Sequence, residues 1–399
     1  MAQELRRVPK SELDARLAAF RCAMTARDPN WSLALIHHKI NMYYMTGTMQ
    51  DGVLAIRPDG AILWVRRSLT RARSESLFDD IRPMKSFRTL AEFYTDVPAT
   101  AYVETRYASL DWMEMLRKYL PIAHAHSVNG VMDDLRAVKS AYEIDCIRMA
   151  GCIHAEVLEK IVPTLLHEGV SEAGLAADIF KAMLLRGGHG IARFNQPLGE
   201  DVVGYVSFGK SALVTAAFDG PGGTDGTCIA VQSIGSASRQ LTRGRLVYLD
   251  TPCGYDGYHT DKSTVYYFGD LDADPDGQLI REAYGYCQAL ESEIASRLKP
   301  GTIPQDVYTE VMDKLDVRYI DGFMNGGRFL GHSVGLFVDE SPVLAKGFRE
   351  PLRENMVFAI EPKIALAGIG TVGTENTYLI TAHGAEPLSG TPQPLREIK

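Results

Sequence analysis

The sequence lacks several features that would place it in a specialised class of protein. It has only six cysteines among 399 residues, and none forms a C-x-x-C pair, so the spacing of a structural zinc site is absent. The amino terminus has no apolar core of a signal peptide, and no stretch approaches the roughly 18 apolar residues of a membrane span. Scattered cysteines are typical of free thiols in a reducing compartment. We therefore expect a cytoplasmic protein with no membrane partner.

A basic excess is also missing. The chain has 42 Lys and Arg against 50 Asp and Glu, a formal net charge of −8. Because nucleic-acid binding requires a basic surface, nucleic acid is excluded as the main partner. The hydrophobic fraction of 46% and the charged fraction of 23% are ordinary for globular proteins and exclude disordered, collagen-like and coiled-coil classes. The acidic excess could reflect carboxylates that bind cations.

The pattern of predicted elements changes near residue 130, which predicts two domains, residues 1–133 and 134–399. In the first, short strands alternate with helices, as in a small α/β domain. Ser11 is predicted to cap the first helix. Strands are predicted at 32–36, 42–47, 52–56, 61–65 and 100–104, and a helix at 110–120.

The second domain is predicted to mix helices with strands. The helices are expected at 135–162, about 172–186, about 276–297 and about 304–315. The strands are expected at 246–250, 263–268, 356–361 and 376–381.

Asp250 and Asp261 lie on either side of a predicted hairpin turn. In one register they are directly opposite, and in the other Asp261 opposes Pro252 and is diagonal to Asp250. Both registers place the carboxylates on one face, because side chains alternate with period two. Pro252 cannot donate to a ladder, which favours the first register and its wider loop. Two like charges so placed need a cation or a proton between them.

A second pair of carboxylates repeats this arrangement. Glu361 and Glu375 are symmetric about Gly368, so the flanking strands can bring them face to face. Glu361 follows an apolar run that is typical of a buried strand, and a buried glutamate needs a partner.

His332 lies between glycines in the apolar segment 329–342. Together with the two aspartates and two glutamates, it makes four carboxylates and one imidazole. That set suits one or two divalent ions such as manganese, iron, cobalt or zinc, rather than a structural zinc. Two ions bridged by carboxylates could generate a hydroxide near neutral pH and polarise a carbonyl.

The ordered series of Asp250, Asp261, G-H-S-V-G-L, I-E-P and T-E-N-T resembles the M24 metallopeptidases of the pita-bread fold, a family that includes prolidase, aminopeptidase P and the metal-free creatinase. The segment 43–48, Y-Y-M-T-G-T, is similar to the creatinase/prolidase N-terminal domain, and 135–144 to the start of the catalytic domain. The resemblance implies an α+β chain, with a pita-bread catalytic domain preceded by a smaller α/β creatinase-type domain.

The resemblance also implies residue roles. Glu361 would also be a proton shuttle. Apart from the resemblance, His259 lies two residues before Asp261 and would face the same side of a regular strand, where it is a candidate for a further catalytic group. Asp339 stands where the family has a histidine in H-E-x-P. The implied metal ligands are Asp250, Asp261, His332, Glu361 and Glu375.

Three departures from the family pattern concern the groups that hold substrate. No histidine lies between His189 and His259, where prolidases have one before the first aspartate. Asp339 replaces the second histidine, and D-x-T-R-T has lost its arginine. An aspartate in place of a neutral histidine would favour a cationic substrate group, or would need to be protonated to donate.

From these observations we expect a metal-dependent peptidase, most simply an Xaa-Pro dipeptidase or aminopeptidase, acting on a small peptide or peptide-like substrate. Its cofactors would be two divalent ions (manganese, cobalt or zinc) holding a bridging hydroxide. Two alternatives remain: a creatinase-like hydrolase or lyase of a small non-peptide metabolite, and a non-enzymatic binding module. The resemblance alone implies a homodimer.

Overall fold

The computed structural model describes residues 6–195, 200–217 and 220–399. The chain divides into two compact units, residues 1–136 and 137–399. The boundary predicted at 133/134 falls three residues earlier, inside helix α6 (Asn129–Ala137). The chain therefore passes from one unit to the next at the end of this helix.

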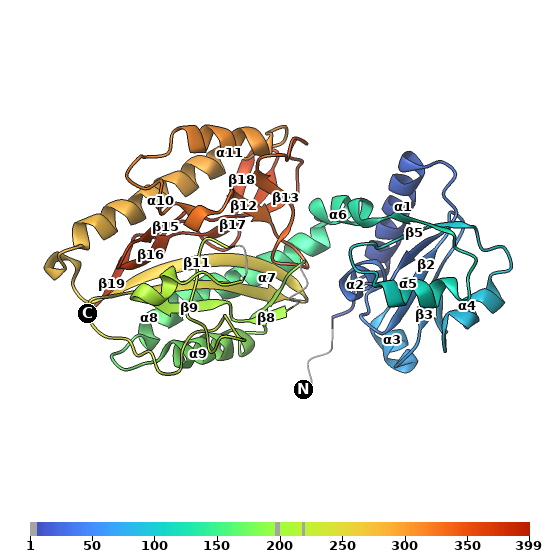
Figure 1. Ribbon diagram of the computed structural model, residues 1–399, viewed down its shortest axis with the longest axis horizontal. Helices are drawn as coiled ribbons and strands as arrows, with labels where there is room; N and C mark the ends of the chain where they lie inside the picture. Colours follow the sequence, from blue (N-terminus) through green and yellow to red (C-terminus); the bar gives the residue numbers. More distant parts are fainter. Residues whose placement is uncertain (1–5, 196–199, 218–219) are drawn as a thin grey trace. The chain divides into compact units, whose positions relative to one another are not determined.

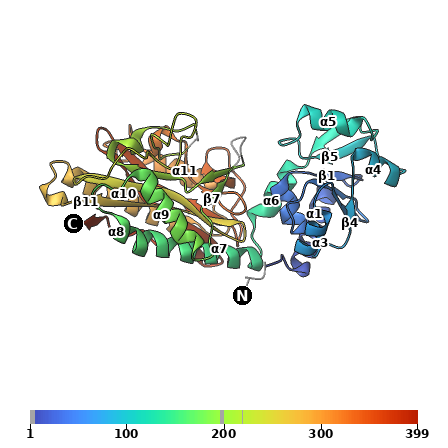
Figure 2. The same ribbon diagram turned by 90° about the horizontal axis from the view of Figure 1, so that it is seen from below.

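The first unit contains one six-stranded sheet with helices on both sides (Figures 1 and 2). Its strand order is β4-β3-β2-β1-β5-β6, antiparallel along β1-β2-β3 and parallel at both edges. The small α/β domain expected from the sequence is therefore confirmed. Its elements are α1 (Lys10–Arg27), β1 (Ala34–Ile36), α2 (Lys39–Thr46), β2 (Gly52–Ile56), β3 (Ala61–Val65), α3 (Leu69–Glu75), β4 (Ile81–Pro83), α4 (Phe87–Phe93), β5 (Thr100–Val103), α5 (Leu110–Arg117) and β6 (His124–Ser127).

Two local predictions for this unit are wrong. Residues 42–47 do not form a strand, because the segment belongs to helix α2, which ends at Gly47 with φ 75°. Six of the eight side chains of α2 are buried, so the sequence shows no polar face from which a helical period could be read. Ser11 does not cap α1, since the helix already begins at Lys10, directly after Pro9.

The long helix predicted over 135–162 is interrupted at residues 138–140. Val138 forms a bridge with Met356, and Ser140 then begins α7 (Ala141–Glu156) with a capping box that includes Glu143. The Ser-x-x-Glu signature of that box was present in the sequence. A π-helical turn, η1 (Val157–Ile161), connects α7 to α8 (Val162–Leu165).

The second unit holds two larger sheets between two groups of helices. In Figures 1 and 2, α7, α8 and α9 (Glu172–Leu184) lie on one side of the sheets, and α10 (Gly277–Arg297) and α11 (Pro304–Asp313) on the other. The four-stranded sheet has the order β19-β11-β10-β9, and the five-stranded sheet the order β13-β12-β14-β17-β18. Two further pairs are β15-β16 and β7-β8.

The strands of this unit include one long hairpin and several short segments. They are β7 (Ile191–Arg193), β8 (Glu200–Val202), β9 (Tyr205–Phe208), β10 (Arg245–Tyr255), β11 (Tyr258–Phe268), β12 (Phe329–Ser333), β13 (Glu340–Ala345), β14 (Val357–Ile360), β15 (Lys363–Leu366), β16 (Gly370–Gly373), β17 (Asn376–Thr381), β18 (Gly384–Pro387) and β19 (Arg396–Ile398). Three 3-10 turns are η2 (Gly209–Leu213), η3 (Leu271–Ala273) and η4 (Met324–Gly326).

Strand β10 is buried on both faces, and this determines where its carboxylate points. Leu246 and Tyr248 pack into the core that contains α10 and β14, whereas Val247 and Leu249 pack into the core that contains η1 and α9. By the period of two, Asp250 lies on the same face as Tyr248. Asp250 is therefore directed toward the core that contains α10 and β14.

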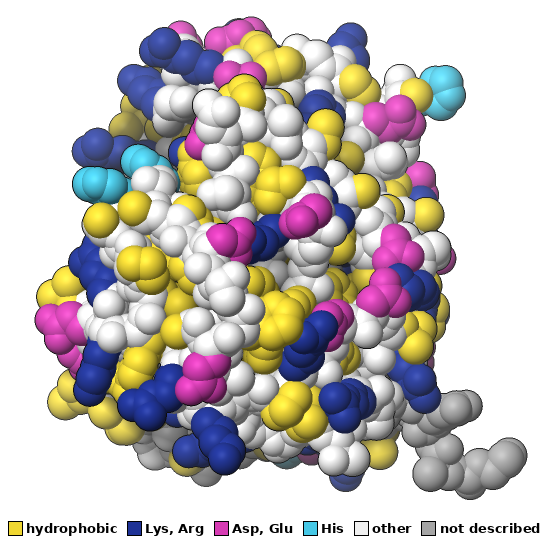
Figure 3. Space-filling view, turned by 90° about the vertical axis from the view of Figure 1, so that its right-hand side faces the viewer, with side chains coloured by type: hydrophobic (Ala, Val, Ile, Leu, Met, Phe, Trp, Pro, Cys, Tyr) yellow, Lys and Arg dark blue, Asp and Glu magenta, His cyan; other side chains and the backbone are white. Residues whose placement is uncertain are grey.

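Three further observations concern the helices, the cysteines and the charged surface. Among the described residues, no helix combines the length and apolarity needed to cross a bilayer. All six cysteines lie in the described part of the chain and are free thiols. On the face shown in Figure 3, Lys and Arg side chains are interspersed with Asp and Glu side chains.

Candidate metal centre

The first pair of carboxylates lies on the hairpin of β10 and β11. Asp256 and Gly257 form a two-residue turn with φ values of 49° and 88°, the left-handed conformations of a type I′ turn. This turn places Pro252 opposite Asp261, so that Asp250 is diagonal to Asp261. The favoured register, with the two aspartates directly opposite, is therefore wrong, and the second register is confirmed.

Pro252 does not exclude this register because its position needs no ladder donor. The backbone N–H of Asp261 donates to Thr377 Oγ1 at 3.0 Å, and the carbonyl of Asp261 accepts from the same hydroxyl at 2.9 Å. Both backbone groups of Asp261 thus point away from β10, as in a non-hydrogen-bonded pair of an antiparallel ladder. A proline opposite such a residue leaves no hydrogen bond unmade.

The second pair of carboxylates lies at a break between two short ladders. β14 pairs with β17 and β15 pairs with β16, and both ladders are centred on Gly368, as the sequence predicted. Glu361 follows β14 and Glu375 precedes β17, so the two glutamates face each other across the break. They are 4% and 0% exposed.

His332, on β12, lies beside both pairs. Its Nε2 atom is 3.2 Å from Glu361 Oε1 and 4.0 Å from Asp261 Oδ2. Its Nδ1 atom is 3.1 Å from Asp339 Oδ1. Asp339 thus lies on the far side of the imidazole, which is where a carboxylate orients a metal-ligating histidine.

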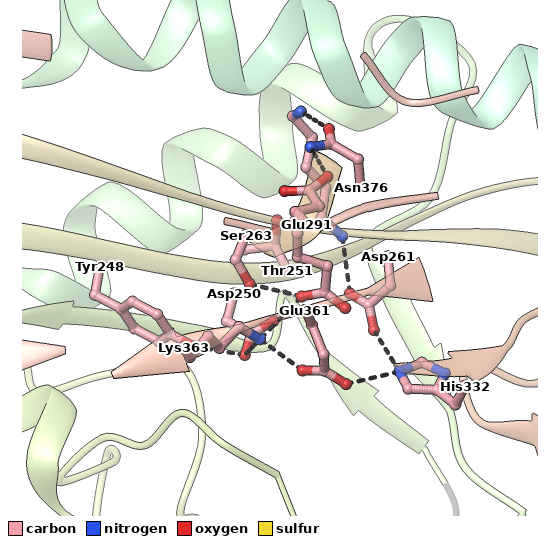
Figure 4. Close-up of polar contacts among 12 residues, drawn as sticks. Tyr248, Asp250, Thr251, Asp261, Ser263, Glu291, His332, Glu361, Lys363 and Asn376 are labelled. Atoms are coloured by element: carbon pink, nitrogen blue, oxygen red, sulfur yellow. Dashed lines mark hydrogen bonds and ion pairs between the residues drawn. The ribbon is translucent and has the colours of Figure 1, made fainter. Parts of the chain in front are cut away.

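The fold therefore brings together the five side chains predicted as ligands. Figure 4 labels Asp250, Asp261, His332 and Glu361 among them. One ligand atom each from Asp261, His332 and Glu375 lies within 4.8 Å of the other two, and all three residues are buried. Carboxylate oxygens and an imidazole nitrogen are the donors that divalent transition metals accept. These three residues fit one divalent ion.

Lys363 occupies the other side of the cluster. Its Nζ atom lies 2.9 Å from Asp250 Oδ2, 2.8 Å from Glu361 Oε2 and 2.9 Å from Glu375 Oε2. The side chain is 1% exposed. Figure 4 shows its amine beside Asp250 and Glu361. A second ion bound by the same three carboxylates would need the position that this amine occupies. The expected pair of ions therefore does not fit the residues as they stand.

The pKa values of the carboxyl groups around Lys363 differ from one another. Burial raises the pKa of Glu361, but the charges and hydrogen bonds of Lys363 and His332 together outweigh it and lower that pKa to about 2. Burial and the charge of Asp250 raise the pKa of Asp261 well above its usual range, and burial and Asp261 do the same for the pKa of Glu375. The negative charges of Asp261 and Glu375 are thus the least compensated by the protein.

His259 does not reach the cluster. Its Nδ1 atom is 3.0 Å from the carbonyl oxygen of Gly335, and its Nε2 atom is 2.8 Å from the carbonyl oxygen of Ile191. The ring also packs edge-on against His189, with 5.2 Å between the centroids. These contacts hold backbone segments in place, so the geometry gives His259 a structural position and not the catalytic one expected.

Three described residues whose side chains donate hydrogen bonds to ligand carboxylates were not predicted from the sequence. Besides Lys363, these are Tyr248, whose hydroxyl donates to Asp250 Oδ2 at 2.8 Å, and Ser263, whose hydroxyl donates to Glu375 Oε2 at 2.6 Å. Each lies two residues from a predicted ligand. The period of two along a strand was the available signal, since it puts such neighbours on the ligand face.

A cavity of about 440 Å³ opens onto the cluster. Aromatic and small apolar side chains form much of its wall. No lysine or arginine is among the described residues that line it. Its acidic and histidine lining residues are Asp201, Asp250, Asp261, His332, Asp339 and Glu361.

Comparison with known sequences agrees with this geometry. The family model described as Metallopeptidase family M24 matches residues 145–382, and that of the Creatinase/Prolidase N-terminal domain matches residues 16–138. The probable dipeptidase PepE of Mycobacterium tuberculosis is 29% identical over 287 residues, which cover 69% of this chain and 66% of that protein. The Xaa-Pro dipeptidase of Pyrococcus horikoshii is 27% identical over 372 residues, covering 90% and 93%.

A solved structure shares the fold. The prolidase from Pyrococcus horikoshii OT3 superimposes with a TM-score of 0.77 at 22% identity, covering 96% of this chain and 99% of that one. The two-domain α+β architecture expected from the sequence, with a pita-bread domain after a creatinase-type domain, is confirmed by this match. The resemblance carried by the ligand motifs is likewise confirmed.

Proposed function

Because the chain belongs to metallopeptidase family M24, we propose that it is a metal-dependent hydrolase that cleaves the C–N bond of a small peptide, with Xaa-Pro dipeptides as the first candidates. The observation that carries this proposal is a group of four carboxylates and one imidazole, all buried except the partly buried Asp250, next to a cavity that all of them but Glu375 line. The names of the relatives support the choice of substrate: one is an Xaa-Pro dipeptidase and another a probable dipeptidase.

In this proposal the metal ligands come from the five predicted residues, with Asp261, His332 and Glu375 as the central set. A divalent ion held there supplies a water of lowered pKa and polarises a carbonyl oxygen. Asp339 holds the imidazole of His332 through Nδ1 and so keeps Nε2 directed toward Asp261 and Glu361.

Glu361 is proposed to accept the proton of the attacking water, because it lines the cavity beside His332. Its low pKa, caused by Lys363 and His332 together, keeps it ionised and able to accept a proton. The same low pKa makes it a weak base, so the proton has to pass onward to the leaving nitrogen. The choice among manganese, cobalt and zinc, the homodimer and the cytoplasmic location remain predictions.

One observation favours a second candidate function, the hydrolysis or lysis of a small cationic metabolite that is not a peptide. Five acidic side chains line the cavity, and no lysine or arginine is found among its described lining residues. A dipeptide brings a free carboxylate that needs a cationic or donor partner. Asp201 and Asp339 offer the opposite charge and would attract an ammonium or amidinium group.

The deciding experiment is a substrate screen with added manganese or cobalt. Xaa-Pro dipeptides are compared with amidino and betaine-like compounds, and Asp261→Asn serves as the inactive control. Cleavage of Xaa-Pro dipeptides by the wild type and not by the control supports the first function. Turnover of cationic metabolites alone supports the second, and activity retained by Asp261→Asn contradicts the placement of the reaction at this site.

A further inference from the structure

The ammonium group of Lys363 has no donor left for any further partner. A lysine has three N–H donors, and Asp250, Glu361 and Glu375 each accept one at 2.8–2.9 Å. These are lengths of charge-assisted hydrogen bonds. The group is therefore fully bonded inside the cluster, at one point shared by three of the four carboxylates.

A metal ion bound by the same three oxygens would need the same point. Ion-to-oxygen distances of about 2.0–2.2 Å would place it at the centre of the oxygens that now surround Nζ. A lysine ammonium and a divalent cation cannot share this position, for reasons of both volume and charge. The three oxygens can therefore surround either the lysine ammonium or a metal ion, but not both.

The backbone is built to hold the lysine there. Lys363 is paired with Gly373 across the β15–β16 ladder. A Cβ atom at Gly373 would lie 2.7 Å from Lys363 Cγ and 2.8 Å from Lys363 Cα. The stem of Lys363 therefore takes up the space that a side chain at residue 373 would need. The lysine is a packed part of the hairpin and not a surface side chain that has folded inward.

The opposite side of the cluster remains suited to an ion. Glu375 Oε2 accepts from Lys363 and Ser263, but Glu375 Oε1 is buried without a hydrogen-bond partner among the described residues. A buried carboxylate oxygen without a hydrogen-bond partner lowers the stability of the folded state. It belongs to the residue that, with Asp261 and His332, forms the group of three potential ligands.

We propose that Lys363 takes the place of one of the two metal ions, and that this chain binds a single divalent ion on Asp261, His332 and Glu375. The inference rests on the proposed metal-dependent function and specifies its cofactor. Formal charge agrees with it: the four carboxylates, one ammonium and one divalent ion leave a single negative charge. Two ions beside the ammonium would instead leave an excess positive charge in a buried site.

The proposal is tested by counting the metal ions bound per chain. The protein is loaded with Mn²⁺, freed of excess metal by gel filtration and assayed by mass spectrometry of the metal. We expect one ion per chain in the wild type and two in Lys363→Ala. Lys262→Met is the matched control, because Lys262 is also buried but pairs with Glu159 and Asn376; it should keep one ion.

A second measurement on the wild type alone avoids dependence on the folding of Lys363→Ala. Electron paramagnetic resonance of the Mn²⁺ protein should show an isolated ion without exchange coupling to a neighbour. The proposal is overturned if the wild type binds two ions or none, if its spectrum shows exchange coupling, or if folded Lys363→Ala binds only one ion. The count needs no substrate, so it stands apart from failure to cleave dipeptides, which would overturn the proposed function instead.

Discussion

The two hairpins that supply the carboxylates manage two like charges in different ways. In β10–β11, a continuous ladder with a two-residue turn makes Asp250 and Asp261 diagonal neighbours. In the second hairpin, Glu361 and Glu375 face each other at a break between ladders. Lys363 lies at that break and contacts both glutamates.

This difference shows that register and a built-in cation are two solutions to one electrostatic problem. Diagonal positions separate residues by about 7–8 Å, whereas directly opposed positions bring Cβ atoms to about 4.5–5.5 Å, where like charges are destabilising. The first hairpin reduces the repulsion by its register, and its Asp250 also accepts a hydrogen bond from Lys363. The second accepts close approach and compensates with an ammonium group, which leaves one side of the cluster for a metal.

The largest effect expected is the loss of both metal and activity when a ligand is removed from either hairpin. Asp261→Ala and Glu375→Ala each delete a member of the three-ligand group. Activity should fall by more than the roughly 10²–10³-fold that loss of one oxyanion donor costs. Asp272→Ala, at an exposed side chain, is the control. Unchanged metal content in either ligand variant would refute the ligand assignment.

The next effect concerns the second hairpin alone. In the metal-free protein, Lys363→Met leaves three carboxylates around an empty, buried position, and we expect a loss of about 3–5 kcal/mol in the free energy of unfolding. Urea denaturation with and without Mn²⁺ measures it, and Mn²⁺ should restore part of the loss. A loss below about 1 kcal/mol would mean that the lysine is not what compensates this hairpin.

Much of this comparison could be predicted from the sequence, since period-two alternation and symmetry about Gly368 are local properties. The strands around Asp250, Asp261, Glu361 and Glu375 were expected and are present. The register of the first hairpin was predicted wrongly, because the sequence shows only that Pro252 lacks a backbone N–H donor. Whether that donor is needed depends on Thr377, which is distant in sequence.

The parts that could not be predicted depend on long-range packing. The period of two could have placed Lys363 on the face of Glu361, but no local pattern shows that its amine reaches Asp250, 113 residues earlier. The side chain of Asp339 meets His332 only because β12 and β13 are paired through irregular positions. Most side chains of α2 are buried, so its sequence lacks the alternation of polar and apolar residues that would identify a surface helix.

A smaller effect separates the two hairpins through the hydroxyls that donate to their carboxylates. Ser263→Ala removes the donor to Glu375, an ion ligand in our proposal, and should weaken Mn²⁺ binding by about 10–100-fold. Tyr248→Phe removes a donor to Asp250, which also pairs with Lys363, so metal affinity should change by no more than about twofold. Isothermal titration with Mn²⁺ measures both, and equal losses would contradict a single ion on the Glu375 side.

The smallest effect tests the back of the first hairpin. His154 on α7 is fully buried, with its ring nitrogens 3.0 Å from Thr260 Oγ1 and 3.1 Å from Thr251 Oγ1. Burial, and then the charge of Lys262, lower its pKa well below 6.5. Only the unfolded state therefore binds this proton below about pH 6.5, so its contribution to stability is complete above that pH and falls as the pH decreases.

His154→Gln should remove this dependence, which amounts to at most about 1.4 kcal/mol per pH unit. Urea denaturation of wild type and variant between about pH 7.5 and 5 measures the difference. The exposed His383→Gln should leave the slope unchanged. Parallel curves for wild type and His154→Gln would mean that His154 takes up its proton in the folded state. The first hairpin would then carry a cation behind its aspartates, and the contrast with the lysine of the second hairpin would be lost.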